Sequence, residues 1–95
     1  MKHNGYNLHL SKGKYPNGQN SIKLIIDDES SEENGFPYAT ASIAINEHLK
    51  PNEIAIKDYS ENEGILEMLV DNNIVSQPIR FVHSGYVAIP ICNLI

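Results

Sequence analysis

An alternation of apolar and polar residues with a period of two is the feature that most constrains how this chain can fold. Four segments show it, and Gly, Pro, Asn or Asp residues border each of them. They are residues 5–12, 21–27, 36–45 and 53–59. Such alternation predicts strands that bury one face. Two further apolar runs within residues 79–92 flank Ser84-Gly85 and predict a tight hairpin.

Only one segment, roughly residues 60–72, has apolar residues at helical spacing. The residues of this apolar stripe are Ile65, Leu66, Leu69 and Val70. They would lie on one side of a helix and face the core. Ser60 and Glu63 have the S-x-x-E spacing of a capping box, in which both side chains satisfy free amide donors. The segment therefore predicts a helix of about three turns that begins at Ser60.

The order of these elements, β-β-β-β-α-β-β, predicts an α+β fold. We expect an antiparallel sheet of five to six strands with one helix packed on it, in a single domain over residues 1–95. Pro90 lies in the last apolar run and has no amide donor, so its strand should be bulged or at a sheet edge. The expected core consists of Leu8, Leu24, Ile26, Ile43, Ile45, Ile54, Ile56, Ile65, Leu66, Leu69, Phe81, Val87 and Ile89.

Composition argues against several classes of partner. The chain has a net charge of -5, with six lysines, one arginine and no basic run. Binding to a nucleic-acid backbone or to an anionic membrane surface requires clustered basic residues. No apolar stretch reaches the roughly 20 residues of a membrane-spanning helix, and the first residues lack an apolar signal region. We therefore expect a cytoplasmic protein that binds neither nucleic acid directly nor membranes.

Few residues suggest catalysis or metal binding. His83 and Ser84 are adjacent on an expected strand and would point to opposite faces, which disfavours a triad with Asp58. Residues 13–18, GKYPNG, lack the strand–loop–helix context of a phosphate loop. Cys92, the single cysteine, is more typical of a small buried apolar residue than of a reactive thiol. We expect no enzymatic activity, no metal and no cofactor.

Acidic residues concentrate in two places. The first, which we call the acidic loop, spans residues 27–33 and contains Asp27, Asp28, Glu29, Glu32 and Glu33. The second, which we call the acidic row, consists of Glu63, Glu67 and Asp71. Like charges four residues apart destabilise a helix by roughly 0.2–0.5 kcal/mol per pair, and Asp71 would lie at the negative end of the helix dipole. The row is either a solvated helix face or a docking surface for a basic partner.

Three stretches carry a family resemblance. They are PYATASIAI at residues 37–45, IAIKDYSENEGILEMLV at residues 54–70 and HSGYVAIPICNL at residues 83–94. Together they resemble a family of small uncharacterised proteins carried by bacteriophages and mobile elements, over roughly residues 36–95. In that family a Y-A-T-x-x-V/I strand precedes an acidic or Asn-containing turn into one helix, and an S/T-G-F/Y-V/A-x-x-P strand follows. The resemblance implies an accessory protein in the cytoplasm of a bacterial host, and many such proteins inhibit host defence, CRISPR systems included.

Three functions follow as hypotheses. The first is a non-enzymatic protein that binds a host or self protein, either through an acidic face that meets a basic surface or through an exposed edge strand. Its sharpest form is an inhibitor of a CRISPR-type defence complex. Both the acidic loop and the acidic row would contribute to that binding. The second is a structural module whose edge strand pairs with a second copy to form a homodimer. The third, a small hydrolase or nucleotide-binding protein, would require a pocket with convergent polar groups.

Overall fold

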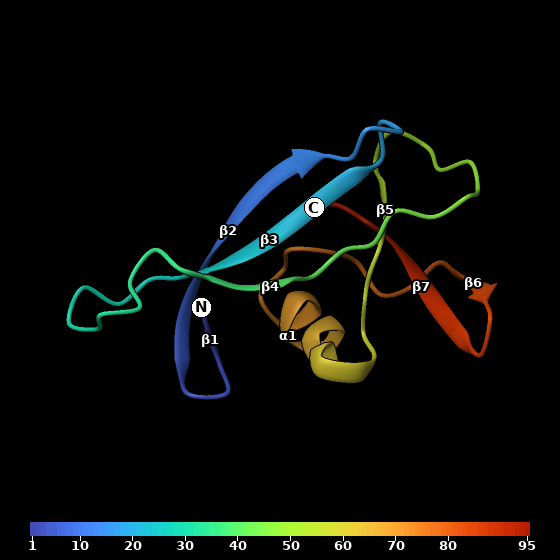
Figure 1. The fold of residues 1–95 in the computed structure, drawn as a ribbon. Coiled ribbons are helices and arrows are strands. Elements are labelled where there is room, and N and C mark those ends of the chain that lie inside the picture. Colours follow the sequence, from blue (N-terminus) through green and yellow to red (C-terminus); the bar gives the residue numbers. More distant parts are fainter.

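The computed structural model describes residues 1–95 and contains one α-helix among short strands (Figure 1). The elements are β1 (Lys2–His3), β2 (Tyr6–Lys14), β3 (Asn20–Ile26), β4 (Pro37–Thr40), β5 (Glu53–Ala55), the 3-10 helix η1 (Ser60–Asn62), α1 (Ile65–Asp71), β6 (Arg80–Ser84) and β7 (Val87–Asn93). The predicted α+β class, with antiparallel strands and a single helix, is confirmed. No helix has the length and apolar character that crossing a membrane requires.

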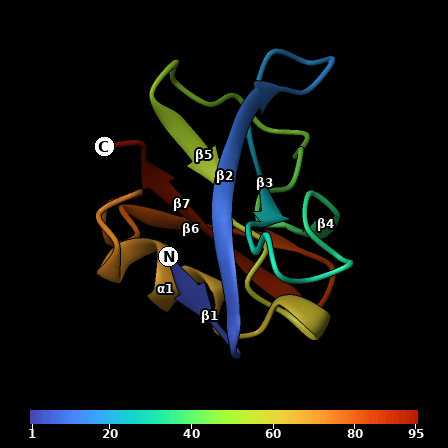
Figure 2. The same cartoon turned by 90° about the vertical axis from the view of Figure 1, so that its left-hand side faces the viewer.

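The strands divide between two antiparallel sheets where one sheet was expected. One sheet has the order β1-β2-β3-β4 and the other has the order β5-β7-β6 (Figures 1 and 2). The chain passes between them directly after β4, where the Ala41 amide still donates to Ile22 of β3 and the Ile43 amide already donates to Ala55 of β5. Both sheets impose the same period of two, so alternation alone could not separate them.

The main core lies where α1 and the two sheets meet. Its buried members are Leu8, Ile22, Leu24, Ile26, Ala41, Ile54, Ile56, Ile65, Met68, Leu69, Val75 and Cys92. The expected burial is confirmed for Leu8, Leu24, Ile26, Ile54, Ile56, Ile65, Leu69 and Ile89, whereas Ile43, Ile45, Leu66 and Val87 are half-buried. The assignment of Phe81 to the core is wrong, because its side chain on β6 is 56% exposed.

The predicted start of the helix is also wrong. Ser60 begins the short helix η1, and α1 begins only after Gly64, whose φ of 93° lies in the left-handed region. Glu63 is extended between the two helices, so Ser60 and Glu63 do not form a capping box. Asp58 caps the helix instead. Its Oδ1 atom accepts the amide hydrogens of Gly64 at 3.1 Å and Leu66 at 2.9 Å.

This cap predicts a specific loss of stability. Asp58→Ala removes the acceptor of two amide donors and should lower the free energy of unfolding by about 0.5–2 kcal/mol. Asp58→Asn keeps an oxygen that can accept in the same place, so this control should recover most of the loss. Urea unfolding of both variants measures the difference. Equal losses in the two variants would contradict the assignment of Asp58 as the cap.

Pro90 lies neither in an edge strand nor in a bulge of the β6–β7 pair, contrary to the expectation from sequence. β7 is the central strand of its sheet, and Pro90 pairs with Phe81 on the β6 side. On the β5 side, the Ile56 amide donates to the Pro90 carbonyl at 3.0 Å. A regular antiparallel pair would return a second hydrogen bond, which proline cannot donate. Pro90 is tolerated in this central strand because it lies just beyond the end of β5, where the hydrogen bonds between β5 and β7 stop.

Candidate functional site

The acidic row lines one side of a shallow hollow of about 400 Å³. Glu67 and Asp71 come from α1, and Glu63 comes from the turn before it. The hairpin that begins with β1 forms the facing wall through Lys2, His3 and Asn4. Glu63 is outside the helix, so the expected helical row is wrong at that position. The fold nevertheless brings the three carboxylates of the row to one surface.

No carboxylate of the acidic row takes part in an ion pair. The ion pairs of the structure are His9–Asp27, Lys57–Glu61 and Arg80–Glu53. All three residues of the row are exposed. Lys2 lines the same hollow without forming an ion pair with any of them. The hollow is therefore a negatively charged surface whose charge no neighbouring side chain neutralises by direct contact.

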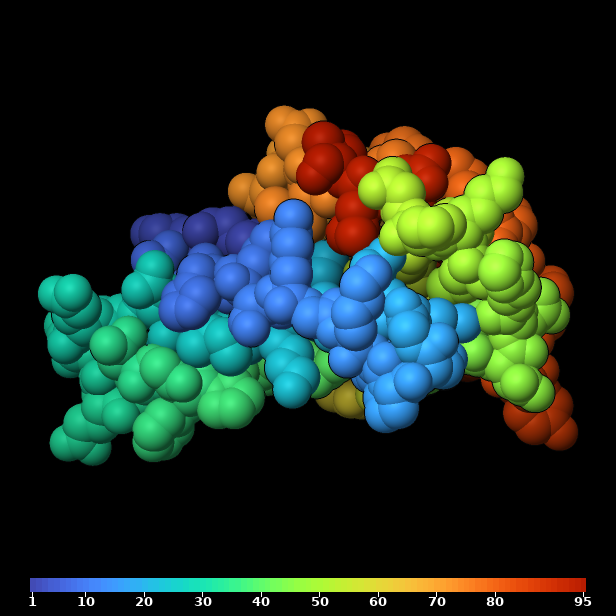
Figure 3. Space-filling view, turned by 90° about the horizontal axis from the view of Figure 1, so that it is seen from above, coloured from blue at the N-terminus to red at the C-terminus, as the bar shows by residue number.

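The acidic loop connects β3 and β4 and projects from one end of the molecule (Figures 1 and 3). Local hydrogen bonds shape it. Asp28 accepts from the amide of Ser30 at 3.1 Å and from its hydroxyl at 2.7 Å, and the hydroxyl above all lowers the pKa of Asp28. The Asp28 amide donates to the Asn34 side chain at 2.9 Å. The loop is thus an ordered turn with its remaining carboxylates facing solvent.

The acidic loop and the acidic row do not form one continuous face. Figure 1 shows the loop beyond the ends of β3 and β4, whereas α1 lies beneath the middle of the molecule. None of the residues that line the hollow of the acidic row belongs to the loop. A single partner surface would therefore meet these two regions as separate contacts.

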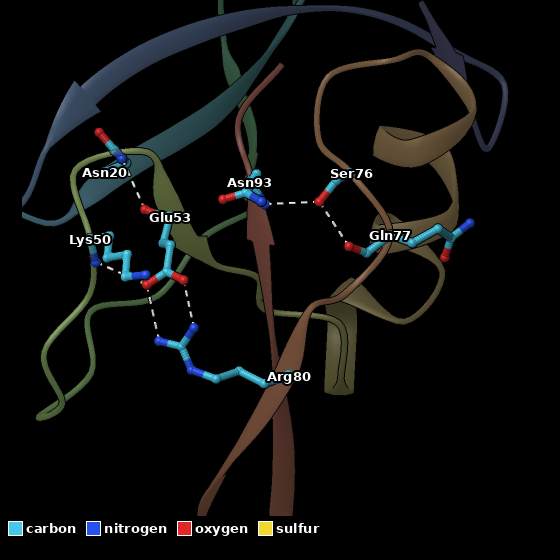
Figure 4. Close-up of polar contacts among 7 residues, drawn as sticks. All are labelled: Asn20, Lys50, Glu53, Ser76, Gln77, Arg80 and Asn93. Atoms are coloured by element: carbon cyan, nitrogen blue, oxygen red, sulfur yellow. Dashed lines mark hydrogen bonds and ion pairs between the residues drawn. The ribbon is translucent and has the colours of Figure 1, made fainter.

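An ion pair that no sequence pattern indicated joins the buried Glu53 of β5 to the partly exposed Arg80 of β6 (Figure 4). Arg80 donates to both carboxylate oxygens of Glu53, at 2.5 and 3.0 Å, and the Lys50 amide donates to the same carboxylate at 2.9 Å. These contacts, led by the arginine, hold the pKa of Glu53 at about 2. Glu53 is 4% exposed and its oxygens are occupied, so the pair stabilises the second sheet and the carboxylate is closed to a ligand, whereas the Arg80 side chain is 42% exposed.

The residues considered for catalysis are not brought together. His83 and Ser84 line a hollow of about 240 Å³ beside residues 43–47, and Asp58 lines a different one. Asp58 is also engaged as the cap of α1. Burial of Cys92 is confirmed and raises the pKa of its thiol to about 11, which keeps it protonated and unreactive at neutral pH. No group of three or more His, Cys, Asp or Glu side chains could hold a metal ion.

The largest hollow has a volume of about 540 Å³ and lies between residues 38–44 and residues 57–62. Several of its polar side chains bind one another or the backbone. Tyr15 contacts the Ser42 hydroxyl at 2.9 Å, and Asn62 donates to the Thr40 carbonyl at 2.7 Å. Lys57 and Glu61, the two charged residues that line the hollow, form an ion pair with each other. These groups do not converge on the open space, as a site for a small substrate would require.

Comparisons with known proteins give no further information about the site. Family models, curated protein sequences and solved structures were compared with the chain, and none of them matched. The resemblance to phage and mobile-element proteins therefore stays a hypothesis drawn from the sequence motifs. Charge distribution and exposed edges are the features on which a functional proposal can be built.

Proposed function

We propose that this chain is a non-enzymatic binding protein whose acidic row docks on the basic surface of a host or self protein. The observation that carries the proposal is the group of three exposed carboxylates that line one hollow without an ion pair. Side chains of one charge sign at one surface attract a partner of the opposite sign and accelerate its association.

The charge of the row adds little net stability to α1, because Glu67 lies in the first turn, where it favours the helix dipole, while its repulsion from Asp71 opposes this gain. Glu67 and Asp71 are four residues apart on α1, where like charges repel by roughly 0.2–0.5 kcal/mol. Asp71 is also the last residue of α1, where a negative charge opposes the helix dipole. A basic partner surface would relieve both effects, so the arrangement is more favourable in a complex than in the free protein.

The sharpest form of the proposal is inhibition of a CRISPR-type defence complex in the bacterial cytoplasm. Support for this form comes from the family resemblance of residues 36–95 and from charge. Effectors that bind nucleic acid hold its backbone in grooves lined with Lys and Arg. A small acidic protein that occupied such a groove would exclude the nucleic acid by competition.

Affinity capture from bacterial lysate tests the proposal with a matched pair of variants. The row variant carries Glu63→Gln, Glu67→Gln and Asp71→Asn. The loop variant carries Glu29→Gln, Glu32→Gln and Glu33→Gln, which removes the same charge from the acidic loop and spares Asp28, whose carboxylate shapes that loop. We expect the parent and the loop variant to retain a basic protein that the row variant loses.

Mass spectrometry identifies the captured protein, and competition with its nucleic acid tests the inhibitory form. Equal capture by the parent and both variants would show that the acidic row does not mediate the interaction. Loss of capture in the loop variant alone would show that the acidic loop, and not the acidic row, makes the contact. Either result would contradict the proposed role of the row.

A further inference from the structure

The outer edge of β6 is unpaired and unprotected. β6 is the terminal strand of its sheet, and no backbone hydrogen bond joins Arg80–Ser84 to any segment other than β7. Proteins commonly shield such edges with charged side chains, lysine above all. The open edge of β2 carries Lys12 and Lys14, both exposed. The one charged side chain of β6, Arg80, is held by Glu53.

Exposed apolar side chains accompany this edge. Phe81 is 56% exposed on β6 itself, Ile79 is 49% exposed just before the strand, and Tyr86 is fully exposed in the turn that follows it. These are three of the six large apolar residues that the fold leaves exposed. Apolar surface grouped along an open strand edge is typical of a protein contact.

The charge distribution indicates which partner this edge can accept. All twelve acidic residues lie at or before position 71, and residues 72–95 contain a single charged side chain, that of Arg80. Because the chain has a net charge of -5, two copies repel each other over most of their surfaces. β6 itself carries no acidic residue, Glu53 neutralises its only cation, and Glu47 is the one acidic side chain that lines the hollow beside Val82, His83 and Ser84. A second copy can therefore approach here with less like-charge repulsion than at the two acidic regions.

We propose that β6 pairs antiparallel with β6 of a second copy around a twofold axis at Val82. Such pairing would build a continuous sheet with the order β5-β7-β6-β6-β7-β5. In this register Val82 lies opposite Val82, Phe81 opposite His83, and Arg80 opposite Ser84 of the other copy. Because of the twofold axis, the Phe81–His83 pair and the Arg80–Ser84 pair each occur twice.

The side chains agree with this register. Phe81 meets an imidazole ring across the strands, and such cross-strand ring pairs are favourable. No two like charges lie opposite each other, because Arg80 faces a serine. The sequence is thus self-complementary along the edge, as a twofold contact requires.

The contact is independent of the proposed binding function. Figures 1 and 3 show the β6–β7 hairpin at the end of the molecule opposite the acidic loop. None of the residues that line the hollow of the acidic row belongs to the hairpin. Pairing through β6 would therefore leave both acidic regions free and present each of them twice.

Sedimentation equilibrium over a range of protein concentrations tests the pairing. The parent should approach twice the monomer mass as concentration rises. Phe81→Lys removes both ring contacts and places a lysine on the edge, so it should weaken dimerisation by about tenfold or more. Phe36→Lys is the matched control, because Phe36 is 57% exposed and lies in the loop before β4. A parent that stays monomeric, or equal weakening by both variants, would overturn the proposal.

Disulfide cross-linking tests the register. Directly opposite residues on antiparallel strands have Cα atoms about 4.5–5.5 Å apart, within the range that a disulfide spans. Val82→Cys should therefore form a covalent dimer under mild oxidation, whereas Ser84→Cys, which would face Arg80, should not. The buried Cys92 does not compete. Cross-linking of neither variant, or of Ser84→Cys as fast as Val82→Cys, would contradict pairing at Val82.

Discussion

Replacing Leu69 with alanine should lower the free energy of unfolding by about 2–5 kcal/mol. Leu69 lies on α1, is fully buried and belongs to the main core, where the helix packs against both sheets. Its removal leaves a cavity, because the sheets on which α1 packs are tied to each other by hydrogen bonds and cannot collapse freely into the gap. Urea unfolding with a two-state fit measures the loss.

Leu66→Ala is the matched control for this result. The sequence placed Leu66 and Leu69 in the same buried stripe, but the structure leaves Leu66 half-buried at the margin of the core. The same three carbon atoms are removed in both variants, so the difference reports burial alone. We expect the smaller loss for Leu66→Ala. A loss equal to or greater than that of Leu69→Ala would show that α1 is rotated about its axis.

Replacing Glu53 with glutamine should destabilise the protein at neutral pH and very little at pH 2. The pKa of Glu53 is about 2 in the folded protein, below the ordinary value of 4.5, because Arg80 and the Lys50 amide bind the carboxylate. A folded-state pKa below the unfolded value stabilises the fold above pH 4.5, and this stability is lost as pH falls to about 2. Glutamine has no charge to lose and leaves the guanidinium of Arg80 without its partner.

The difference in unfolding free energy between the parent and Glu53→Gln should therefore decrease as pH falls from 4.5 to about 2. Glu61→Gln is the control, because Lys57 also lowers the pKa of Glu61 to about 2 while the Glu61 side chain is 65% exposed. Solvent weakens exposed ion pairs, so this variant should change stability much less at every pH. Urea unfolding at a series of pH values measures both. A pH-independent difference for Glu53→Gln would contradict the role of the charged pair.

The sequence predicted the fold class more reliably than the points where one element or sheet ends and the next begins. Period-two alternation and one helical segment predicted the strands and the single helix, because burial of one face imposes those periods. The division into two sheets depends on where residues 41–43 leave β3 for β5, and alternation is the same on both sides of that point. The cap of α1 comes from Asp58, further upstream than the Ser60 that local capping rules favour.

The candidate sites show the same limit. Spacing grouped Glu63, Glu67 and Asp71 correctly on one surface, although Glu63 reaches the hollow from a turn and not from the helix. The Glu53–Arg80 pair joins residues 27 positions apart, and only the order of the strands brings them together. Phe81 was expected in the core because an alternating strand does not reveal how far its neighbours extend.

We expect the acidic row to serve binding and not folding. Removal of its charges in the row variant should change the free energy of unfolding by no more than a few tenths of a kcal/mol, since the lost Glu67–Asp71 repulsion offsets the lost interaction of Glu67 with the helix dipole. A clear loss of stability would mean that the row has a structural role. Stability must therefore be measured on the same preparation that is used for binding.

Association kinetics with the captured partner, measured as a function of salt concentration, show whether the acidic row contributes to binding. We predict that the parent associates about tenfold or more faster than the row variant at low salt, because opposite charges steer the encounter. The two rates should converge as salt rises, since screening removes the attraction. Equal association rates and equal salt dependence for the parent and the row variant would contradict the account and reduce the acidic row to a solvated surface.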